Sequence, residues 1–464
     1  MIITDMTITE ELSSFAANLE LKDVPSIVVR RTKYLMLDSI GNAIRARHDS
    51  ESTPALIAAV QAMGMGQGNA HVFADAQGYS AAGATLINGT LAHSLDFDDT
   101  HAAAIVHPGA PIIPAVLAAA EMADASGADV IAAIAAGYEV ALRLALALPA
   151  GAHYDRGFHP TATCGIFGAA AAAARIFGLS PAQVAAAFGI ALSQTAGSLQ
   201  FLANGAWTKR FQVGWAGMAG FAAACLAREG FKGAAQPIEG KHGFLRAYSP
   251  TPEPSRVLKD LGEVWELMQT GVKPYPSCRW GHAGIDAALA LRAEHGLEPD
   301  GIEAVTLGLS RAGMLLIGEP AEKKANPANI VDAQFSAPFV LAMALSSGAM
   351  GWSSYDKLAD PAVRTLMGRI RCENDPEIEA EFPANMSGKL TVRAGGRDLV
   401  KTVIVPKGEP SNFLSEAELT AKFSGLTQDI LGDSAAMGLA GVVLELDQLN
   451  SVASLFSLSV PRPG

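Results

Sequence analysis

The stretch GIFGAAAAAARIFGLSPAQVAAAFGIAL, residues 165–192, decides the fold class of this chain. Its commonest residue is alanine, which has the highest helix propensity, and Ser180-Pro181 interrupts it where one helix ends and the next begins. Helices made of such small residues can approach one another closely, as in a compact bundle. The stretch thus predicts helices at residues 165–177 and 181–196, and similar alanine-rich runs predict further helices at residues 115–125 and 128–148.

A change of pattern near residue 263 predicts a second kind of structure. Alternating apolar residues predict strands, and the paired glycines Gly395-Gly396 predict the turn of a hairpin. The predicted strands cover residues 264–273, 302–309, 389–392 and 399–405. Helical patterns lie between these strands or after Pro406, at residues 281–295, 330–347, 415–431 and 444–458.

These patterns predict a mainly α protein with a smaller α+β domain. A length of 464 residues is enough for two or three domains of ordinary size. We expect residues 1–265 and 406–464 to form one all-helical domain from both ends of the chain. Residues 266–405 are expected to form an inserted α+β domain.

The charge balance and the cysteines exclude several classes of protein. The 34 Lys and Arg residues against 46 Asp and Glu residues give a net charge of −12 without any basic block, so we expect no nucleic acid partner. The cysteines form no CxxC pair, which argues against a zinc site or a disulfide framework. Glu10 and Glu11 are acidic where a targeting segment would be basic, so we expect a cytoplasmic protein. The four cysteines are Cys164, Cys225, Cys278 and Cys372, and none lies in a catalytic signature.

Three long uncharged stretches imitate membrane spans, at residues 176–208, 211–227 and 333–355. They contain more Ala and Gly than Leu and Ile, and polar residues such as Gln194 and Asn204 lie inside them, which would be costly in lipid. Loops rich in Lys or Arg do not alternate along the chain. We therefore expect no membrane association and interpret these stretches as buried helices of a large helical domain.

The densest polar cluster is HSLDFDDTH, residues 93–101, followed by His107-Pro108. On a helix, His93, Asp96 and Thr100 would share one face. Three interpretations remain open: aspartates that cap a helix end, a site for a hard cation, or a carboxylate that acts on substrate protons or orients a histidine. The cluster contains no loop of the DxDxDG kind, so we predict no metal.

Two histidines share one construction, because His107 and His159 each precede a proline that comes just before a long alanine-rich helix. Proline suits the first turn of a helix, and the residue before it is held extended. A histidine in this position faces the positive end of the helix dipole, which favours the neutral ring and also attracts anions. A structural role is common for one such histidine, but two of them indicate a functional site. The expected helices cover residues 111–125 and 161–177.

The pair Lys209-Arg210 stands between two uncharged segments. These cations either mark the end of a helix or lie among buried helices, where Lys209 could hold a carboxylate or lose a proton because burial lowers its pKa. The stretch KPYPSCRWGH, residues 273–282, lies at the junction of the two patterns. It supplies Lys273 and His282 at a place where small-molecule pockets often form.

Together these residues predict a site for a small polyanion. Lys209, Arg210, Lys273 and the helix N-termini can hold carboxylates, while a histidine and Asp96 move a proton at the carbon beside a carboxylate. Such a proton is weakly acidic, so a cationic pocket must spread the charge of the enolate. No GxGxxG follows a predicted strand and no GxxxxGK[ST] occurs, so we expect no nucleotide or redox cofactor.

Several dispersed segments, in order over residues 12–460, resemble those of the MmgE/PrpD family. The segments are NGTLAHSLDFDDT (88–100), HP (107–108), GFHPTATCG (157–165), KR (209–210), KPYPSC (273–278) and DAQFS (332–336). The resemblance implies a helical domain formed by both chain ends, a smaller α+β lid domain and a homodimer. It also implies a small di- or tricarboxylate substrate and no cofactor, because the family includes 2-methylcitrate dehydratase, cis-aconitate decarboxylase and iminodisuccinate epimerase.

The resemblance also implies site residues. The chain is one residue longer than the decarboxylases between Thr100 and His107, and residues 313–330 contain no counterpart of an active-site tyrosine of the decarboxylases. Tyr154, just before the GFHP segment, is a candidate substitute acid or base. The residues that match active-site positions of decarboxylase-like members are Asp96, Thr100, His107, His159, Lys209 and His282.

Four kinds of function therefore remain open. The leading one is a cofactor-free lyase or isomerase that removes the proton alpha to a carboxylate, with dehydration of a 2-methylcitrate-like acid as the first candidate reaction. An epimerase would need two bases on opposite sides of the carbon, for which His159 and either Lys209 or Tyr154 are candidates. Decarboxylation of cis-aconitate is the third, and a binding protein without catalysis is the fourth.

Overall fold

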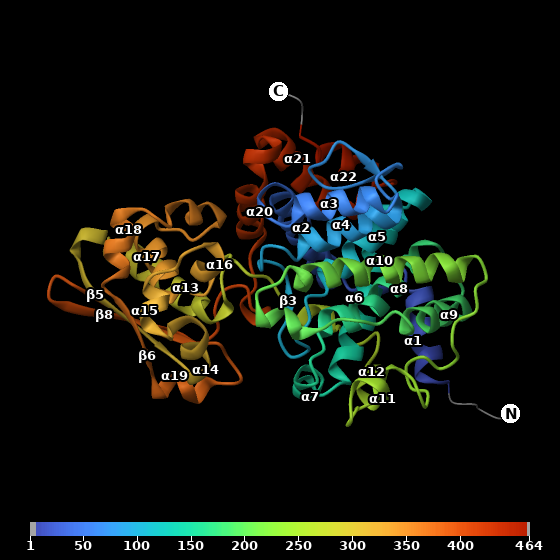
Figure 1. Cartoon of the computed structure of the whole chain (residues 1–464), viewed down its shortest axis with the longest axis horizontal. Helices are drawn as coiled ribbons and strands as arrows, with labels where there is room; N and C mark the ends of the chain where they lie inside the picture. The colour runs from blue at the N-terminus through green and yellow to red at the C-terminus, as the bar shows by residue number, and fades with distance from the viewer. Residues whose placement is uncertain (1–5, 462–464) are drawn as a thin grey trace. The chain divides into compact units, whose positions relative to one another are not determined.

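The computed structural model describes residues 6–461 and divides them into two compact units (Figure 1). The first unit comprises residues 6–271 and 419–461, and the second comprises residues 272–418. The first is mostly helical, whereas the second combines helices with a four-stranded sheet. The predicted fold class, mainly α with a smaller α+β part, is confirmed.

The core of the first unit is built around α8 (Pro160–Ile176). The helices packed on it include α5 (Gly109–Ala123), α6 (Gly127–Leu146), α9 (Pro181–Leu192) and α10 (Thr208–Arg228). These helices approach closely because their contact residues are small: a Cβ atom on Gly168 would lie 2.6 Å from the carbonyl oxygen of Gly137. None of the described helices is long and apolar enough to cross a membrane.

The four alanine-rich runs form α5, α6, α8 and α9, as their composition predicts. Serine residues begin two of these helices, because the Ser126 hydroxyl accepts the Asp129 backbone N–H and Ser180 forms a capping box with Gln183. His159 is the N-cap residue of α8, and His107 lies just before Pro108, the N-cap residue of α5. The predicted placement of both histidines at helix N-termini is therefore confirmed.

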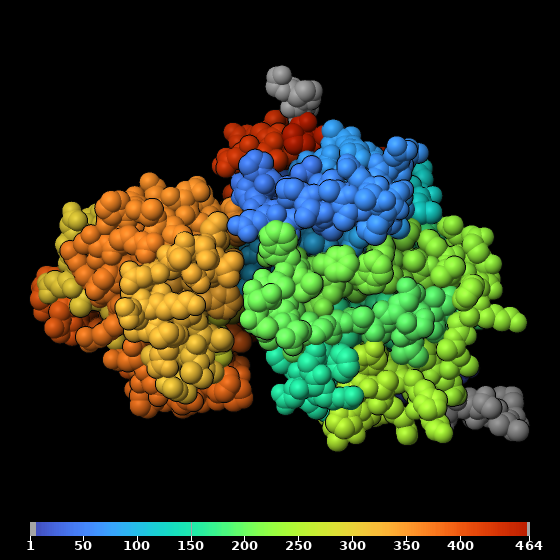
Figure 2. Space-filling model, viewed as in Figure 1, coloured from blue at the N-terminus to red at the C-terminus, as the bar shows by residue number. Residues whose placement is uncertain are grey.

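Both ends of the chain build the first unit. Helix α2 (Ser26–Asp49) packs against α4 (Ala81–Ala92) and against α21 (Asp433–Leu444). Figure 2 shows the last helices, in red, beside the blue N-terminal segments. The helix predicted at 444–458 is not continuous, because α21 ends at Leu444, a 3-10 helix follows at Leu446–Gln448, and α-helix returns only in α22 (Ala453–Leu458). This unit also contains α1 (Ile8–Asn18), α3 (Thr53–Ala62), α7 (Ala150–Asp155), α11 (Phe244–Tyr248), α12 (Ser255–Leu258), β1 (Ala70–His71) and β2 (Gly78–Tyr79).

The sheet of the second unit has the strand order β6-β5-β7-β8. Strand β5 (Ile302–Leu309) is antiparallel to β7 (Gly388–Ala394) and parallel to β6 (Ile370–Asn374), which the sequence did not reveal. Strand β8 (Arg397–Val403) completes the predicted hairpin, whose two glycines have φ values of +56° and +70°. Helix α13 (His282–His295) packs on the hairpin and on α17 (Ala337–Ser347).

Two predicted elements of this region are corrected. The strand expected at 264–273 begins as a 3-10 helix over Glu266–Gln269, and only β4 (Thr270–Gly271) pairs, with β3 (Thr100–His101); all three lie in the first unit. The helix expected at 330–347 is two helices, α16 (Ile330–Gln334) and α17, because the Ser336 hydroxyl accepts the Phe339 backbone N–H and starts a new helix. Helix α20 (Glu416–Leu431) leads the chain back to the first unit. The other helices of the second unit are α14 (Arg311–Gly313), α15 (Ala321–Ala325), α18 (Pro361–Met367) and α19 (Pro376–Glu381).

Candidate active site

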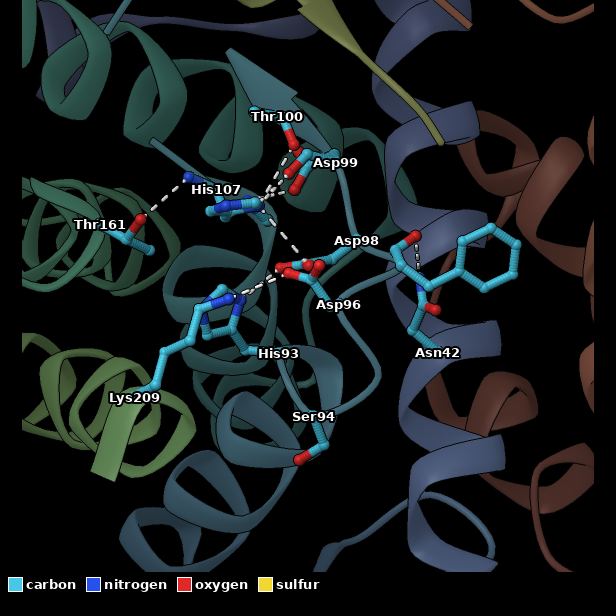
Figure 3. A network of polar contacts seen from close by, with 12 residues as sticks. Asn42, His93, Ser94, Asp96, Asp98, Asp99, Thr100, His107, Thr161 and Lys209 are labelled. Carbon is cyan, nitrogen blue, oxygen red and sulfur yellow. Dashed lines mark hydrogen bonds and ion pairs between the residues drawn. The ribbon is translucent and has the colours of Figure 1, made fainter. Parts of the chain in front are cut away.

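A cluster of histidines and carboxylates lies in the first unit, in the loop between α4 and α5 and at the N-termini of α8 and α10 (Figure 3). Helix α4 ends at Ala92, so residues 93–99 are not helical, and the expected shared helical face of His93, Asp96 and Thr100 does not exist. Asp96 has a φ of +54°, the left-handed region that aspartate tolerates better than most residues. The loop thus directs successive side chains to different partners.

The Asp98 carboxylate is the centre of this loop. Its side chain is only 2% exposed, and His93 Nδ1 donates to Asp98 Oδ2 at 2.6 Å. The other carboxylate oxygen, Oδ1, lies 3.5 Å from His107 Nδ1. The Asp98 side chain therefore faces two imidazoles, which is the arrangement expected of a carboxylate that orients histidines.

The contacts of His107 determine which of its two ring nitrogens carries the hydrogen. Its Nδ1 lies 2.8 Å from the Asp99 carbonyl oxygen and 3.2 Å from Thr100 Oγ1. A carbonyl oxygen only accepts hydrogen bonds, so Nδ1 carries the hydrogen, and Nε2 of the neutral ring carries the lone pair. The backbone N–H of His107 donates to Thr161 Oγ1 at 3.1 Å, which ties the loop to α8.

Asp99 has a structural role. Its Oδ2 accepts from the Tyr138 hydroxyl at 2.8 Å and its Oδ1 accepts from the Gly109 backbone N–H at 3.2 Å. Burial and the neighbouring charge of Asp98 raise the pKa of Asp99 well above its ordinary value. For Asp99, the interpretation as a residue that secures a helix end is therefore correct, because Gly109 is the first residue of α5.

Three imidazole rings lie side by side in the cluster. The His93 ring centroid is 4.9 Å from that of His107 and 5.8 Å from that of His159. The pKa of His159 lies well below its ordinary value, because burial and the nearby His93, Lys209 and His107 all disfavour its charged form. His159 is therefore a neutral imidazole at pH 7. The sequence pattern predicts a neutral histidine here because of the helix dipole, whereas at His159 the causes are burial and the neighbouring side chains.

Lys209 supplies the cation of the cluster. It lies in the first turn of α10, and its Nζ is 2.9 Å from Asp96 Oδ1. Burial lowers the pKa of Lys209, but the charge and hydrogen bond of Asp96, with the charge of Asp98, outweigh burial and leave the pKa raised. Of the two roles open for this residue, an ammonium that holds a carboxylate fits, and an amine that has lost its proton does not. About a third of the side chain is exposed, which leaves the cation accessible.

Two residues hold the backbone of this loop at Phe97, and the sequence did not reveal these contacts. Lys422 of α20 donates to the Phe97 carbonyl oxygen at 2.8 Å, and Asn42 of α2 donates to the same oxygen at 3.2 Å. The Lys422 ammonium also lies 3.6 Å from the centroid of the Phe97 ring and pairs with the buried Asp38. No local signal in the sequence connects these residues, because Asn42 is 55 positions and Lys422 is 325 positions away from Phe97.

Four of the predicted residues have other surroundings. Arg210 NH1 donates to Ser50 Oγ at 3.0 Å. Tyr154 lies on α7, and its side chain is 37% exposed. Lys273 and His282 belong to the second unit, where both are buried and His282 Nε2 donates to the Ser277 carbonyl oxygen at 3.2 Å. Site roles for these four residues stay predictions.

Three residues of the cluster are close enough to hold a metal ion: His93, Asp98 and His107 each offer a ligand atom within 4.8 Å of the others. Two ligand atoms of a tetrahedral zinc, each about 2.0–2.1 Å from the metal, lie about 3.3 Å apart. The His93 Nδ1 to Asp98 Oδ2 distance of 2.6 Å is that of a hydrogen bond, and His107 Nδ1 donates to a carbonyl oxygen. Through these atoms, the arrangement fits a hydrogen-bond network better than a preformed metal site.

Comparison with known proteins identifies the family. The sequence model of the MmgE/PrpD N-terminal domain matches residues 10–257, and that of the MmgE/PrpD C-terminal domain matches residues 275–448. Similar proteins include a cis-aconitate decarboxylase-like protein, oryM, of Aspergillus oryzae, which is 27% identical over 99% of both chains. The cis-aconitate decarboxylase of Aspergillus terreus is 26% identical over 97% of this chain and 95% of its own, and that of Homo sapiens is 27% identical over 81% and 78%. The sequence motifs, the fold and these matches agree, and the chain belongs to the MmgE/PrpD family.

Proposed function

We propose that this protein is a lyase that acts on a small di- or tricarboxylate by removing the proton alpha to a carboxylate, without a cofactor. The observation that carries this proposal is the cluster of His93, Asp98 and His107 beside the cation Lys209. It combines a base with groups that stabilise negative charge, which are the two requirements for breaking such a C–H bond. The enzymatic names of the relatives support a lyase.

His107 is the proposed base. Its Nδ1–H donates to the Asp99 carbonyl oxygen, so the lone pair on Nε2 is available to take a proton. When the ring becomes an imidazolium, the Asp98 carboxylate 3.5 Å from Nδ1 stabilises the new charge. This arrangement follows the logic of other catalytic histidines that have a buried carboxylate behind them.

Negative charge on the substrate would be held by Lys209 and by the N-termini of α5 and α8. The Lys209 ammonium would exchange part of its contact with Asp96 for a substrate carboxylate. The helix N-termini add partial positive charge on the same side. Because the alpha proton is weakly acidic, stabilising the enolate in this way would contribute most of the lowering of the barrier.

Dehydration of a 2-methylcitrate-like hydroxy acid is the first candidate reaction. The C–H bond breaks as Nε2 of His107 takes the proton, a C=C bond forms, and the C–O bond of the neighbouring hydroxyl breaks. The proton can then pass from His107 to the leaving hydroxyl, which departs as water. One imidazole can therefore balance the elimination without an additional acid.

Decarboxylation of cis-aconitate is the second candidate, because the similar proteins carry that name. In that reaction the carbon that loses carbon dioxide must receive a proton, and His107 in its protonated form could supply it. The absence of tyrosine from residues 313–330 removes the counterpart of a tyrosine that we expect in decarboxylases. We therefore place decarboxylation after dehydration.

A homodimer is also proposed. Trp207, Phe211 and Trp215 recur at helical spacing at the start of α10, and each is more than a third exposed. Exposed aromatic residues in such a row are typical of protein interfaces. Light scattering of the purified protein should give the mass of a dimer, and substituting Trp215 with serine should shift the mass toward 48 kDa, the value for one chain.

The function is tested by proton NMR in D2O with citrate, 2-methylcitrate, cis-aconitate and iminodisuccinate. With the wild-type protein, removal of the alpha proton should appear as loss of that proton's signal from one compound, followed by loss of water or by inversion. Loss of carbon dioxide from cis-aconitate with uptake of deuterium would instead identify a decarboxylase. The variant Lys209→Met should lose most of this activity, whereas Lys401→Met, at an exposed ion pair with Glu294, should retain it. Full turnover by Lys209→Met would contradict the assignment of the site.

A further inference from the structure

Gln212 holds both ends of its side-chain amide in defined contacts. It lies on α10, three residues after Lys209, so both side chains project from one face of the helix. Its Oε1 accepts the backbone N–H of Ser198 at 2.9 Å, and its Nε2 lies 2.8 Å from His159 Nδ1. A backbone N–H only donates, so the amide atom facing Ser198 must be the oxygen. The amide nitrogen therefore faces His159.

This contact determines where the His159 ring carries its hydrogen. An amide nitrogen offers hydrogens and no lone pair, so His159 Nδ1 must accept. A neutral imidazole with its lone pair on Nδ1 carries its hydrogen on Nε2. The neutral state agrees with the surroundings of the ring, because burial and the nearby Lys209 hold the pKa of His159 well below its ordinary value.

The backbone around Ser198 keeps this arrangement rigid. The His159 backbone N–H donates to the Gly197 carbonyl oxygen at 3.2 Å, and the Leu199 N–H donates to the Gly157 carbonyl oxygen at 2.8 Å. Gly197 has a φ of +151°, and a Cβ atom there would lie only 2.8 Å from the Ala162 side chain. The same short segment thus fixes the His159 backbone and, through Ser198, the amide that contacts its ring.

We propose that Gln212 is a positioning residue that keeps His159 as the neutral imidazole with its hydrogen on Nε2, so that His159 donates a hydrogen bond to a substrate oxygen and does not act as a base. This inference rests on the proposed function for the reaction it serves. A neutral imidazole that donates to a developing oxyanion stabilises it without any proton leaving the ring. Such a role leaves proton removal to His107 and argues against His159 as one of the two bases of an epimerase.

The position of the hydrogen can be measured without a substrate. Long-range proton–nitrogen NMR correlations of the histidine rings, with the His159 signals identified from their loss in His159→Asn, should place the hydrogen on Nε2 at pH 7.5. In Gln212→Glu the new carboxylate can only accept, so the hydrogen should move to Nδ1. Gln200→Glu adds the same charge at an exposed position nearby and should leave the His159 signals unchanged.

Kinetics then test the consequence for the reaction. Gln212→Glu should lower kcat by about 100-fold with a smaller change in KM, because a donor to the transition state is lost. Gln212→Met has a side chain of similar length that makes no hydrogen bond to His159. Its kcat should therefore lie between those of Gln212→Glu and the wild-type protein. Thermal unfolding of each variant shows whether a low kcat comes from loss of the folded structure or from a changed hydrogen position on the His159 ring.

Each outcome decides a separate question. A hydrogen on Nδ1 in the wild-type protein, or one that stays on Nε2 in Gln212→Glu, would overturn the proposed role of Gln212. If the hydrogen moved to Nδ1 in Gln212→Glu and kcat did not change, the role of His159 as a hydrogen-bond donor would be overturned. If the wild-type protein converted none of the tested acids, the proposed function would fail, whereas the NMR result would still decide the state of the ring.

Discussion

The two His-Pro sites share one sequence pattern but differ in their hydrogen bonds. His107 and His159 each lie at the N-terminus of a long helix. At His107 the partner of Nδ1 is a carbonyl oxygen, whereas at His159 the partner is an amide nitrogen. One ring therefore presents a lone pair on Nε2, and the other presents a hydrogen. The pattern in the sequence determines where a histidine lies, and a residue from elsewhere in the chain determines what its ring can do.

The largest expected effect comes from replacing each histidine separately. His107→Gln should lower kcat by about 10²–10⁴-fold, the range for loss of a general base. His159→Gln should lower it by about 10²–10³-fold, as for loss of an oxyanion donor. The ascending limb of the pH profile of kcat/KM should disappear in His107→Gln and remain in His159→Gln.

The control for this pair is His48→Gln, because His48 is exposed on the surface and outside the cluster. It should keep the wild-type kcat and pH profile. If the ascending limb were lost in His159→Gln and kept in His107→Gln, the roles of the two rings would be reversed.

A second experiment removes a contact of the loop that leads to His107 and leaves the contacts of His159 in place. Lys422→Met removes the cation that pairs with the buried Asp38 and holds the Phe97 carbonyl oxygen. Leaving the buried Asp38 carboxylate without this cation should lower the free energy of unfolding by about 3–5 kcal/mol, measured by urea denaturation. Lys389→Met removes pairs with Glu377 and Asp375 at the surface and should lower the free energy of unfolding much less. Equal losses in the two variants would show that Lys422 contributes no more than a surface lysine.

The pH dependence of stability is a weaker test of the His159 site. The folded state holds the pKa of His159 below the ordinary value of 6.5. Between the two pKa values the unfolded chain binds more protons, so the free energy of unfolding should fall as the pH drops below 6.5. One such group contributes up to about 1.4 kcal/mol per pH unit.

This contribution is isolated by comparing the wild-type protein with His159→Gln over pH 5–8. The difference in their unfolding free energies should be constant above pH 6.5 and should change below it, with the variant losing less stability. His153, whose pKa burial also lowers, contributes equally to both proteins and cancels in the difference. Parallel curves below pH 6.5 would contradict a neutral His159.

The smallest expected effect is that of a chelator. Incubation with EDTA should leave kcat unchanged within about twofold, because the ligand atoms at His93 and Asp98 are already joined by a hydrogen bond. A large loss of activity that returned with one added metal would show that the cluster binds a cation when the enzyme works.

The sequence predicted the features that depend on neighbouring residues. The alanine-rich helices, the hairpin at Gly395-Gly396 and the two histidines at helix N-termini are all set by local patterns. For residues 93–101 the sequence left a helix end with capping aspartates as one open interpretation, but it did not predict the course of the loop after Ala92. The contacts of Lys422 and Asn42 with Phe97 depend on packing between distant segments, which one sequence does not reveal. Gln212 did have a local signal, its position three residues after Lys209, but its contact with His159 needed the structure.

The support of the Phe97 loop by Lys422 has a consequence for synthesis of the protein. During translation, residues 93–107 leave the ribosome long before Lys422, because the whole second unit, residues 272–418, is made in between. At about 5–20 residues per second, the 315 residues from His107 to Lys422 take on the order of 16–63 seconds. During this interval the loop lacks its ammonium partner, and the buried Asp38 carboxylate has no Lys422 to pair with. The candidate active site is therefore completed late, after translation has reached α20.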